Sequence, residues 1–226
     1  MGCVGGPCPE RGKWRSVDAK FNRWAKRGVR AELFEQLKQR AHGIDLECIM
    51  IYSTAAGNHK SAMGAKGGNQ CIGRTAGGPT TKMRLIVDGA ETRFGFTVTA
   101  GNARDSKETC NLIQILEGKY LPKAGKHDVE ECGQRYFLGD KGYISSIIER
   151  ILAAKGWISL IPSRNNSKKP KIIDKRIDQE RRLIENDFER IKKARGVSTG
   201  CAKTVSKIAA FVPPACSCAW LKHLVD

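Results

Sequence analysis

The stretch Phe137-Leu138-Gly139-Asp140-Lys141-Gly142-Tyr143 constrains the fold of this chain more than any other. It continues a short run that is typical of a buried strand, and it leads into the apolar-periodic segment 144–152. An aspartate at the point where a strand ends and a helix begins occupies the usual place of a site residue in an open α/β sheet. An Asp-x-Gly sequence is also a common turn. The function of Asp140 therefore needs support from a second element.

That second element is a helix predicted over residues 177–194, where apolar residues recur at helical spacing. Steps of three, four and seven residues bring four polar side chains onto another face of this helix. These are Asp178, Arg181, Glu185 and Lys192. Ion pairs on a solvated face would explain the pattern equally well if it stood alone.

The two elements together resemble the DDE transposases of bacterial insertion sequences, within the insertion-sequence-four and insertion-sequence-five superfamily. The family signature Tyr-x2-Arg-x3-Glu-x6-Lys is matched at Arg181, Glu185 and Lys192, with Asp178 in the tyrosine position. The segment 138–143 is similar to the family's second-Asp motif. The resemblance implies an α/β protein with an RNase H-like mixed five-stranded sheet flanked by helices, preceded by a short basic helical segment.

The resemblance also implies a chemistry. Asp140 and Glu185 would be catalytic residues and metal ligands, supported by Arg181 and Lys192. A site of this kind uses two Mg²⁺ ions to activate the attacking oxygen and to stabilise the leaving one. Transposon-end DNA would be nicked, and the freed 3′-hydroxyl would attack target DNA.

The chain departs from the family at the first acidic position. The family has Asp-Ser-Thr on the strand predicted over residues 46–54, whereas this chain has Tyr52-Ser53-Thr54. The alignment there is supported by His59, Gly64 and Ala65. A tyrosine is neutral near pH 7 and offers one oxygen, so it cannot replace a bridging carboxylate. The sequence therefore indicates a transposase with impaired catalysis, and the next strand offers Asp88 as the only nearby substitute.

Charge points to a polyanionic partner. Among 226 residues, 40 are Lys or Arg and 23 are Asp or Glu, which gives a net charge of +17. We expect binding to duplex DNA at transposon ends and target, with a homodimer on DNA as the implied assembly. The cations predicted to contact DNA fall in three basic segments and are Arg15, Arg23, Lys26, Arg27, Lys60, Lys66, Arg74, Lys82, Arg164, Lys168, Lys169 and Lys171.

The two ends of the chain carry further expectations. A helix is predicted to begin after Ser16 as N-cap and to end at Gly28, and a second helix follows it. Residues 1–42 are interpreted as the remnant of an N-terminal helical DNA-binding region and 43–226 as the RNase H-like domain, so the start looks truncated. Near the other end, Pro213-Pro214 is predicted to break a helix that begins at Val205.

The middle of the chain supplies the other strands. Residues 80–87 and 93–99 are predicted to form two strands joined by a turn, and residues 157–161 a fifth. Asp105-Ser106 is expected to cap the helix that follows, and Asp105 also recurs in the family pattern.

The cysteine spacing and the hydropathy of the sequence indicate the cellular compartment of the protein. The nine cysteines include no C-x2-C pair, and no apolar run has the length of a membrane span. No secretory signal core is present at the start of the sequence. These features favour an intracellular protein with no membrane partner, and the resemblance implies a bacterial cytoplasmic protein associated with DNA.

Three functional classes remain open from the sequence. The first is an insertion-sequence transposase, and the second is an inactive DNA-binding remnant of one. A basic RNA-binding protein is the third, and it accounts for the charge alone. The order of the motifs favours the first two.

Overall fold

A computed structural model describes residues 13–40, 47–62, 70–89, 93–119, 134–163, 167, 189–200, 202 and 204–223. The N-terminal helices are α1 (Trp14–Arg27) and α2 (Val29–Arg40). The strands are β1 (Cys48–Asn58), β2 (Gly73–Thr75), β3 (Gly78–Asp88), β4 (Arg93–Ala100), β5 (Arg135–Leu138), β6 (Trp157–Leu160) and β7 (Thr199–Gly200). The remaining helices are η2 (Lys60–Ala62), α3 (Asp105–Lys119), η3 (Lys141–Tyr143), α4 (Ser146–Ala154), α6 (Arg195–Ser198) and α7 (Val205–His223).

The five longer strands form one mixed sheet in the order β4-β3-β1-β5-β6. β1 pairs antiparallel with β3, and β3 pairs antiparallel with β4. β5 lies parallel to β1 on its other side, and β6 lies parallel to β5. The short strands β2 and β7 pair with β3 and β1. This is the strand order of an RNase H-like domain, so the predicted fold class is confirmed.

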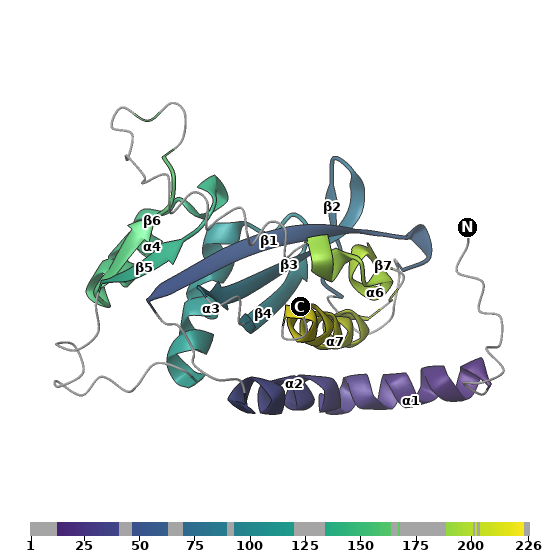
Figure 1. The fold of residues 1–226 in the computed structure, drawn as a ribbon. Coiled ribbons are helices and arrows are strands. Elements are labelled where there is room, and N and C mark those ends of the chain that lie inside the picture. The colour runs from purple at the N-terminus through teal and green to yellow at the C-terminus, as the bar shows by residue number, and fades with distance from the viewer. Residues whose placement is uncertain are drawn as a thin grey trace.

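The central strand β1 buries side chains on both faces, and each face has its own core. Alternate residues of a strand point to opposite sides. Ile49 and Ile51 join a cluster formed with α3 and α4, whereas Met50 and Tyr52 join a cluster completed by α2, α6 and α7. Figure 1 shows α7 lying between the sheet and the pair α1–α2. Helices therefore cover both faces.

The start of the first helix differs from its prediction. Lys13 is the N-cap and contributes no side-chain hydrogen bond, and Ser16 lies inside the helix. The apolar residue Trp14 precedes Ser16 in the same periodic pattern, so the helix begins one turn earlier. Gly28 ends α1 with a φ of 69°, as predicted, because this left-handed conformation favours glycine.

The prediction of a helix break at the two prolines is wrong, because α7 continues through both to His223. Proline lacks the N–H that would bond the carbonyl four residues earlier. For Pro214 that carbonyl belongs to Ala210, and the Arg30 guanidinium donates a hydrogen bond to it at 3.4 Å. The lost helical bond is thus replaced from α2.

Arg30 also joins the N-terminal helices to the domain through an aromatic stack. Its guanidinium carbon lies 4.3 Å from the centre of the Phe21 ring on α1. The Phe21 ring in turn lies 4.7 Å from the Phe211 ring on α7. Burial lowers the pKa of the Arg30 guanidinium, which nevertheless stays protonated. One side chain thus connects α1, α2 and α7.

Replacing Arg30 with alanine is expected to lower the free energy of unfolding by about 1–3 kcal/mol, because the Ala210 carbonyl loses its donor in a buried place. Arg23→Ala is the matched control on the exposed side of α1 and should change stability by less than about 0.5 kcal/mol. Urea unfolding followed by circular dichroism measures both. Equal losses for the two variants would show that the Arg30 contacts contribute nothing.

Candidate active site

Asp140 lies just past the carboxyl end of β5, between the sheet and a short turn. Its backbone is extended, and its Oδ1 accepts a hydrogen bond of 2.7 Å from the Gly142 amide. The aspartate therefore acts as the N-cap of η3 and has a fixed orientation. β5 is parallel to both of its neighbours, so this end of the strand lies at the edge where sheets of this kind carry their sites.

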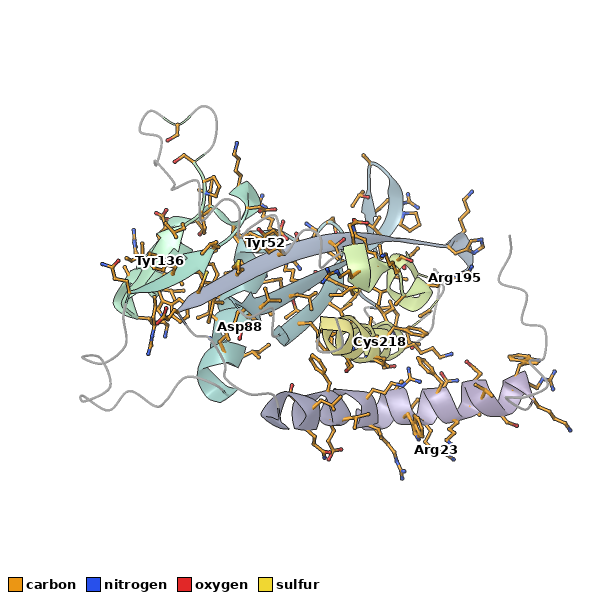
Figure 2. The ribbon with its side chains drawn as sticks, viewed as in Figure 1. Arg23, Tyr52, Asp88, Tyr136, Arg195 and Cys218 are labelled. Carbon is orange, nitrogen blue, oxygen red and sulfur yellow. The ribbon has the colours of Figure 1, made fainter. Side chains whose placement is uncertain are left out.

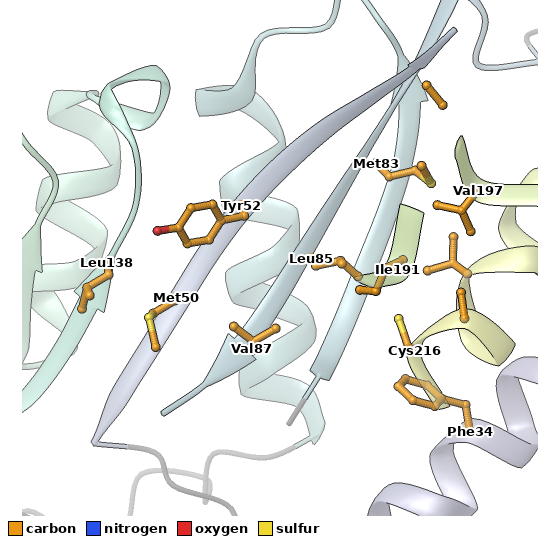
Figure 3. Packing of buried hydrophobic residues seen from close by; sticks show 13 residues of the cluster. Phe34, Met50, Tyr52, Met83, Leu85, Val87, Leu138, Ile191, Val197 and Cys216 are labelled. Carbon is orange, nitrogen blue, oxygen red and sulfur yellow. The ribbon is translucent and has the colours of Figure 1, made fainter. Parts of the chain in front are cut away.

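Tyr52 lies on the neighbouring strand at the same level. Met50 is the register partner of Leu138, so two further residues along each strand bring Tyr52 level with Asp140. The Tyr52 side chain is only 6% exposed and belongs to the apolar cluster that also contains Met50, Leu85 and Leu138. In Figure 3 its ring extends from β1 in the direction of β5. A packed phenol thus takes the place where the sequence comparison expects a carboxylate.

Asp88 does not replace the missing carboxylate. Its register partner on β1 is Ile49, whereas the partner of Tyr52 is Leu85. Three residues of strand separate the two positions, which is about 10 Å. Because Ile49 belongs to the α3 side of the sheet, Asp88 also lies on the face opposite Tyr52.

Asp105, for which the sequence predicts only a helix cap, is a carboxylate that lines the site. Its Oδ1 accepts a hydrogen bond of 2.9 Å from Arg84, and its Oδ2 accepts one of 3.1 Å from Lys82. Both cations come from β3, where alternate residues share a face. Arg84 is completely buried and also donates to the Thr99 hydroxyl and, at 3.0 Å, to the Ala103 carbonyl. This network joins β3, β4 and the start of α3.

The network reaches the Asp140 turn. A Cβ added to Gly142 would lie 2.9 Å from an Asp140 oxygen and 3.3 Å from an Asp105 oxygen. The absence of a side chain at Gly142 thus lets the two carboxylates approach the same turn. Tyr143, the next residue, is fully buried, and this burial raises the pKa of its phenol, with both carboxylates acting in the same direction. A signal for this arrangement existed in the sequence, since Lys82 and Arg84 alternate on a strand before an acidic helix start.

The second sequence-predicted element is described only at its end. Residues 189–192 are helical, and Ile191 is buried in the same apolar cluster as Tyr52. Lys192 is half-buried and forms an ion pair of 2.9 Å with Glu189. Arg181 and Glu185 lie outside the described residues, so their roles stay predictions.

The cations predicted to contact DNA fall into three groups. Arg15, Arg23, Lys26 and Arg27 are exposed on α1, and Lys60 and Arg74 are exposed near the β2 end of the sheet. Figure 2 shows Arg23 on the side of α1 away from the sheet. Lys82 instead pairs with Asp105 and is 19% exposed. The other five, Lys66, Arg164, Lys168, Lys169 and Lys171, lie outside the described residues.

A metal site is not complete within the described part of the chain. There, no three His, Cys, Asp or Glu side chains come together in a way that could hold a metal ion. Of the two predicted ligands only Asp140 is described, and the Asp105 carboxylate beside it already binds two cations. A Mg²⁺ ion prefers several carboxylate and water oxygens at once. The described residues alone therefore do not fit the two-ion site that the resemblance implies.

Known proteins similar to this chain are transposases. No family model matches the chain. A Brucella ovis protein described as a transposase for insertion sequence element IS6501 is 27% identical over 143 residues, which cover 63% of this chain and 99% of that protein.

Among solved structures, a piggyBac transposase synaptic complex with hairpin DNA has a TM-score of 0.47 at 11% identity and covers 79% of this chain. This chain spans about half, 48%, of that transposase chain. The Mos1 mariner catalytic domain has a TM-score of 0.34 at 10% identity, with 88% of this chain and 93% of that one covered. The fold assignment itself depends on the strand order.

Among the residues that the structure describes, no helix combines the length and the hydropathy needed to cross a membrane.

Asp105→Asn should lower the free energy of unfolding by roughly 3–5 kcal/mol, because it leaves the buried Arg84 guanidinium without a counter-charge. Asp18→Asn on α1 is the control, since its ion pair with Lys207 is half exposed and should contribute less than about 1 kcal/mol. Chemical denaturation of both variants makes the comparison. A loss for Asp105→Asn as small as the control's would mean that Arg84 does not depend on this carboxylate.

Proposed function

We propose that this chain is an insertion-sequence transposase by descent, related to the insertion-sequence-four and insertion-sequence-five superfamily, that binds DNA but does not cut it. The ordered motifs, the RNase H-like strand order and the similarity to the IS6501 transposase support the descent. The inactive state is supported by one observation above all. The position level with Asp140 on β1 holds a packed tyrosine.

The packing of Tyr52 is the reason to propose inactivity rather than an altered chemistry. A neutral phenol in an apolar cluster brings no negative charge to the centre of the site. Among the described residues, a cation taken from water would meet the Asp140 carboxylate there and several apolar side chains. Desolvating an ion without compensating ligands is costly. The described residues therefore do not support a catalytic step through a metal ion.

The proposed DNA contacts follow from the exposed cations. α1 contributes Arg15, Arg23, Lys26 and Arg27 on an outer helix, whereas Lys60 lies in η2 and Arg74 in β2. Their side chains are exposed, and the net charge of +17 attracts a polyanion over distance. Double-stranded transposon-end DNA is the proposed partner. An RNA-binding protein would need neither the RNase H-like sheet nor the Asp140 turn.

Binding of the chain to duplex DNA should weaken steeply as salt rises, because each neutralised phosphate releases condensed counterions. With about six phosphates contacted, affinity should fall by about a thousandfold between roughly 50 and 200 mM salt. Fluorescence anisotropy of a labelled duplex gives the slope. The combined variant Arg23→Ala, Lys26→Ala, Arg27→Ala should flatten it, whereas Arg150→Ala on α4 is the control and should not. An affinity independent of salt would exclude electrostatic DNA binding.

The chain should not nick labelled transposon-end DNA in the presence of Mg²⁺, and Tyr52→Asp is the change required before any cleavage appears. The substitution returns a carboxylate to the position level with Asp140. Tyr52→Phe is the matched control, since it keeps the ring and adds no charge, and it should stay inactive. A gel assay of strand cleavage makes the test for all three proteins.

One result would refute the inactive state. If the unmodified chain cut the DNA efficiently and Asp140→Ala abolished that cutting, a transposase using fewer carboxylates would replace the proposal. The proposal that the chain binds duplex DNA would still stand after that outcome.

A further inference from the structure

The first helix carries apolar surface that the fold does not use. No residue of α1 is buried. Trp14 is 55% exposed, Val17 48% and Trp24 36%. The described part of the chain exposes six large apolar side chains, and α1 carries these three of them. Tryptophan is rarely left in water without a partner, since its ring is the largest apolar side chain. These residues therefore mark α1 as a binding surface.

Val17 and Trp24 lie on a flank of α1 that does not face α7, whereas Trp14 lies at the start of the helix on the side that carries Asp18 and Phe21. The contacts with α7 come from Phe21, which stacks on Phe211, and from Asp18, which pairs with Lys207 at 3.3 Å. Successive steps of four, three, four and three residues place another set on one side of the helix. We call this set the α1 outer stripe, and it consists of Lys13, Val17, Lys20, Trp24 and Arg27, all exposed.

Charge decides what kind of partner this stripe can take. Its three cations alternate with its apolar residues, and the Lys20 ammonium lies 4.9 Å from the centre of the Trp24 ring. Arg15 lies in the same way over Trp14, at 5.8 Å. The single acid of α1, Asp18, is bound to Lys207 and Asn22. Two copies of the chain meeting through this stripe would bring like charges together, so the complementary partner is an anion with flat apolar groups.

Single-stranded DNA has this chemistry. Its unpaired bases present π-faces that stack on indole rings, and its phosphates pair with Lys and Arg. In a duplex the bases are already stacked on one another and their faces are covered. A duplex could reach the cations of α1, but it could not use Trp14 and Trp24.

We propose that the α1 outer stripe, together with Trp14 at the start of α1, binds single-stranded DNA. Bases stack on Trp24 and Trp14, and Lys13, Lys20 and Arg27 contact the phosphates between them. The choice of DNA over RNA rests on the proposed function, whereas the choice of an unpaired strand rests on the exposed indoles alone.

The test uses the full chain and a labelled oligothymidylate, with fluorescence anisotropy for affinity and tryptophan quenching for stacking. The double variant Trp14→Ala, Trp24→Ala should bind oligothymidylate more weakly, by about tenfold for each indole on which a base stacks. The same double variant should bind duplex DNA as the unmodified chain does. Trp14→Phe with Trp24→Phe should retain most of the affinity, and Leu33→Ala, which removes an exposed apolar residue from α2, should retain all of it.

Four outcomes would overturn the proposal. The alanine double variant could bind oligothymidylate unchanged, or it could lose duplex affinity to the same extent, which would make the indoles duplex contacts. Tighter binding of oligouridylate would make RNA the partner. The unmodified chain could also fail to bind oligothymidylate but bind phosphatidylserine vesicles, with vesicle binding lost in the double variant. The α1 outer stripe would then be a membrane-binding surface. Failure of the proposed function is separate, because it would appear as duplex binding insensitive to salt.

Discussion

The buried ion pair between Arg84 and Asp105 is the interaction on which the Asp140 end of the sheet depends. A guanidinium with no exposure to water must have its donors satisfied, and here a carboxylate, a hydroxyl and a carbonyl do so. These partners belong to three consecutive parts of the chain, so one residue of β3 fixes where β4 ends and α3 begins. Because the Asp105 carboxylate also lies beside Gly142, the position of the Asp140 turn follows from the same pair. The Arg84 network thus supports the Asp140 turn from the face of the sheet opposite Tyr52.

The interactions that stabilise the sheet do not depend on a carboxylate at position 52. The Arg84 network and the apolar cluster around Tyr52 lie on opposite faces of β1, and neither needs a metal ion to be complete. A tyrosine at position 52 adds apolar area to a core, which favours folding. A lone carboxylate at the same position would have to be desolvated. A chain with tyrosine at this position can therefore form its sheet, its turn and its basic surface without a metal ion.

The sequence was sufficient for the five longer strands and for the turn, because each is defined by a local pattern. The runs at β1, β3 and β4 and the Asp140-Lys141-Gly142 turn could be read from alternation and from Gly and Asp positions. Two features needed tertiary contacts and were misjudged. Asp105 looked like a cap because its partners Lys82 and Arg84 lie more than twenty residues earlier. The two prolines looked like a break because the donor that replaces the lost bond comes from α2. Tyr52 was identified from its neighbours in the sequence, but its burial followed only from the packing of α7 and Ile191.

The bond between Arg30 and the Ala210 carbonyl has a consequence for the order in which the molecule forms. It joins residues 180 positions apart, so it closes almost the whole chain into one loop. A ribosome releases α1 and α2 first and α7 last, at roughly 5–20 residues per second. On the order of ten seconds therefore pass between the synthesis of α1 and α2 and that of Phe211 and Ala210 on α7, the residues that they contact. During that interval they are a free cationic segment, able to meet nucleic acid before the domain to which they belong exists.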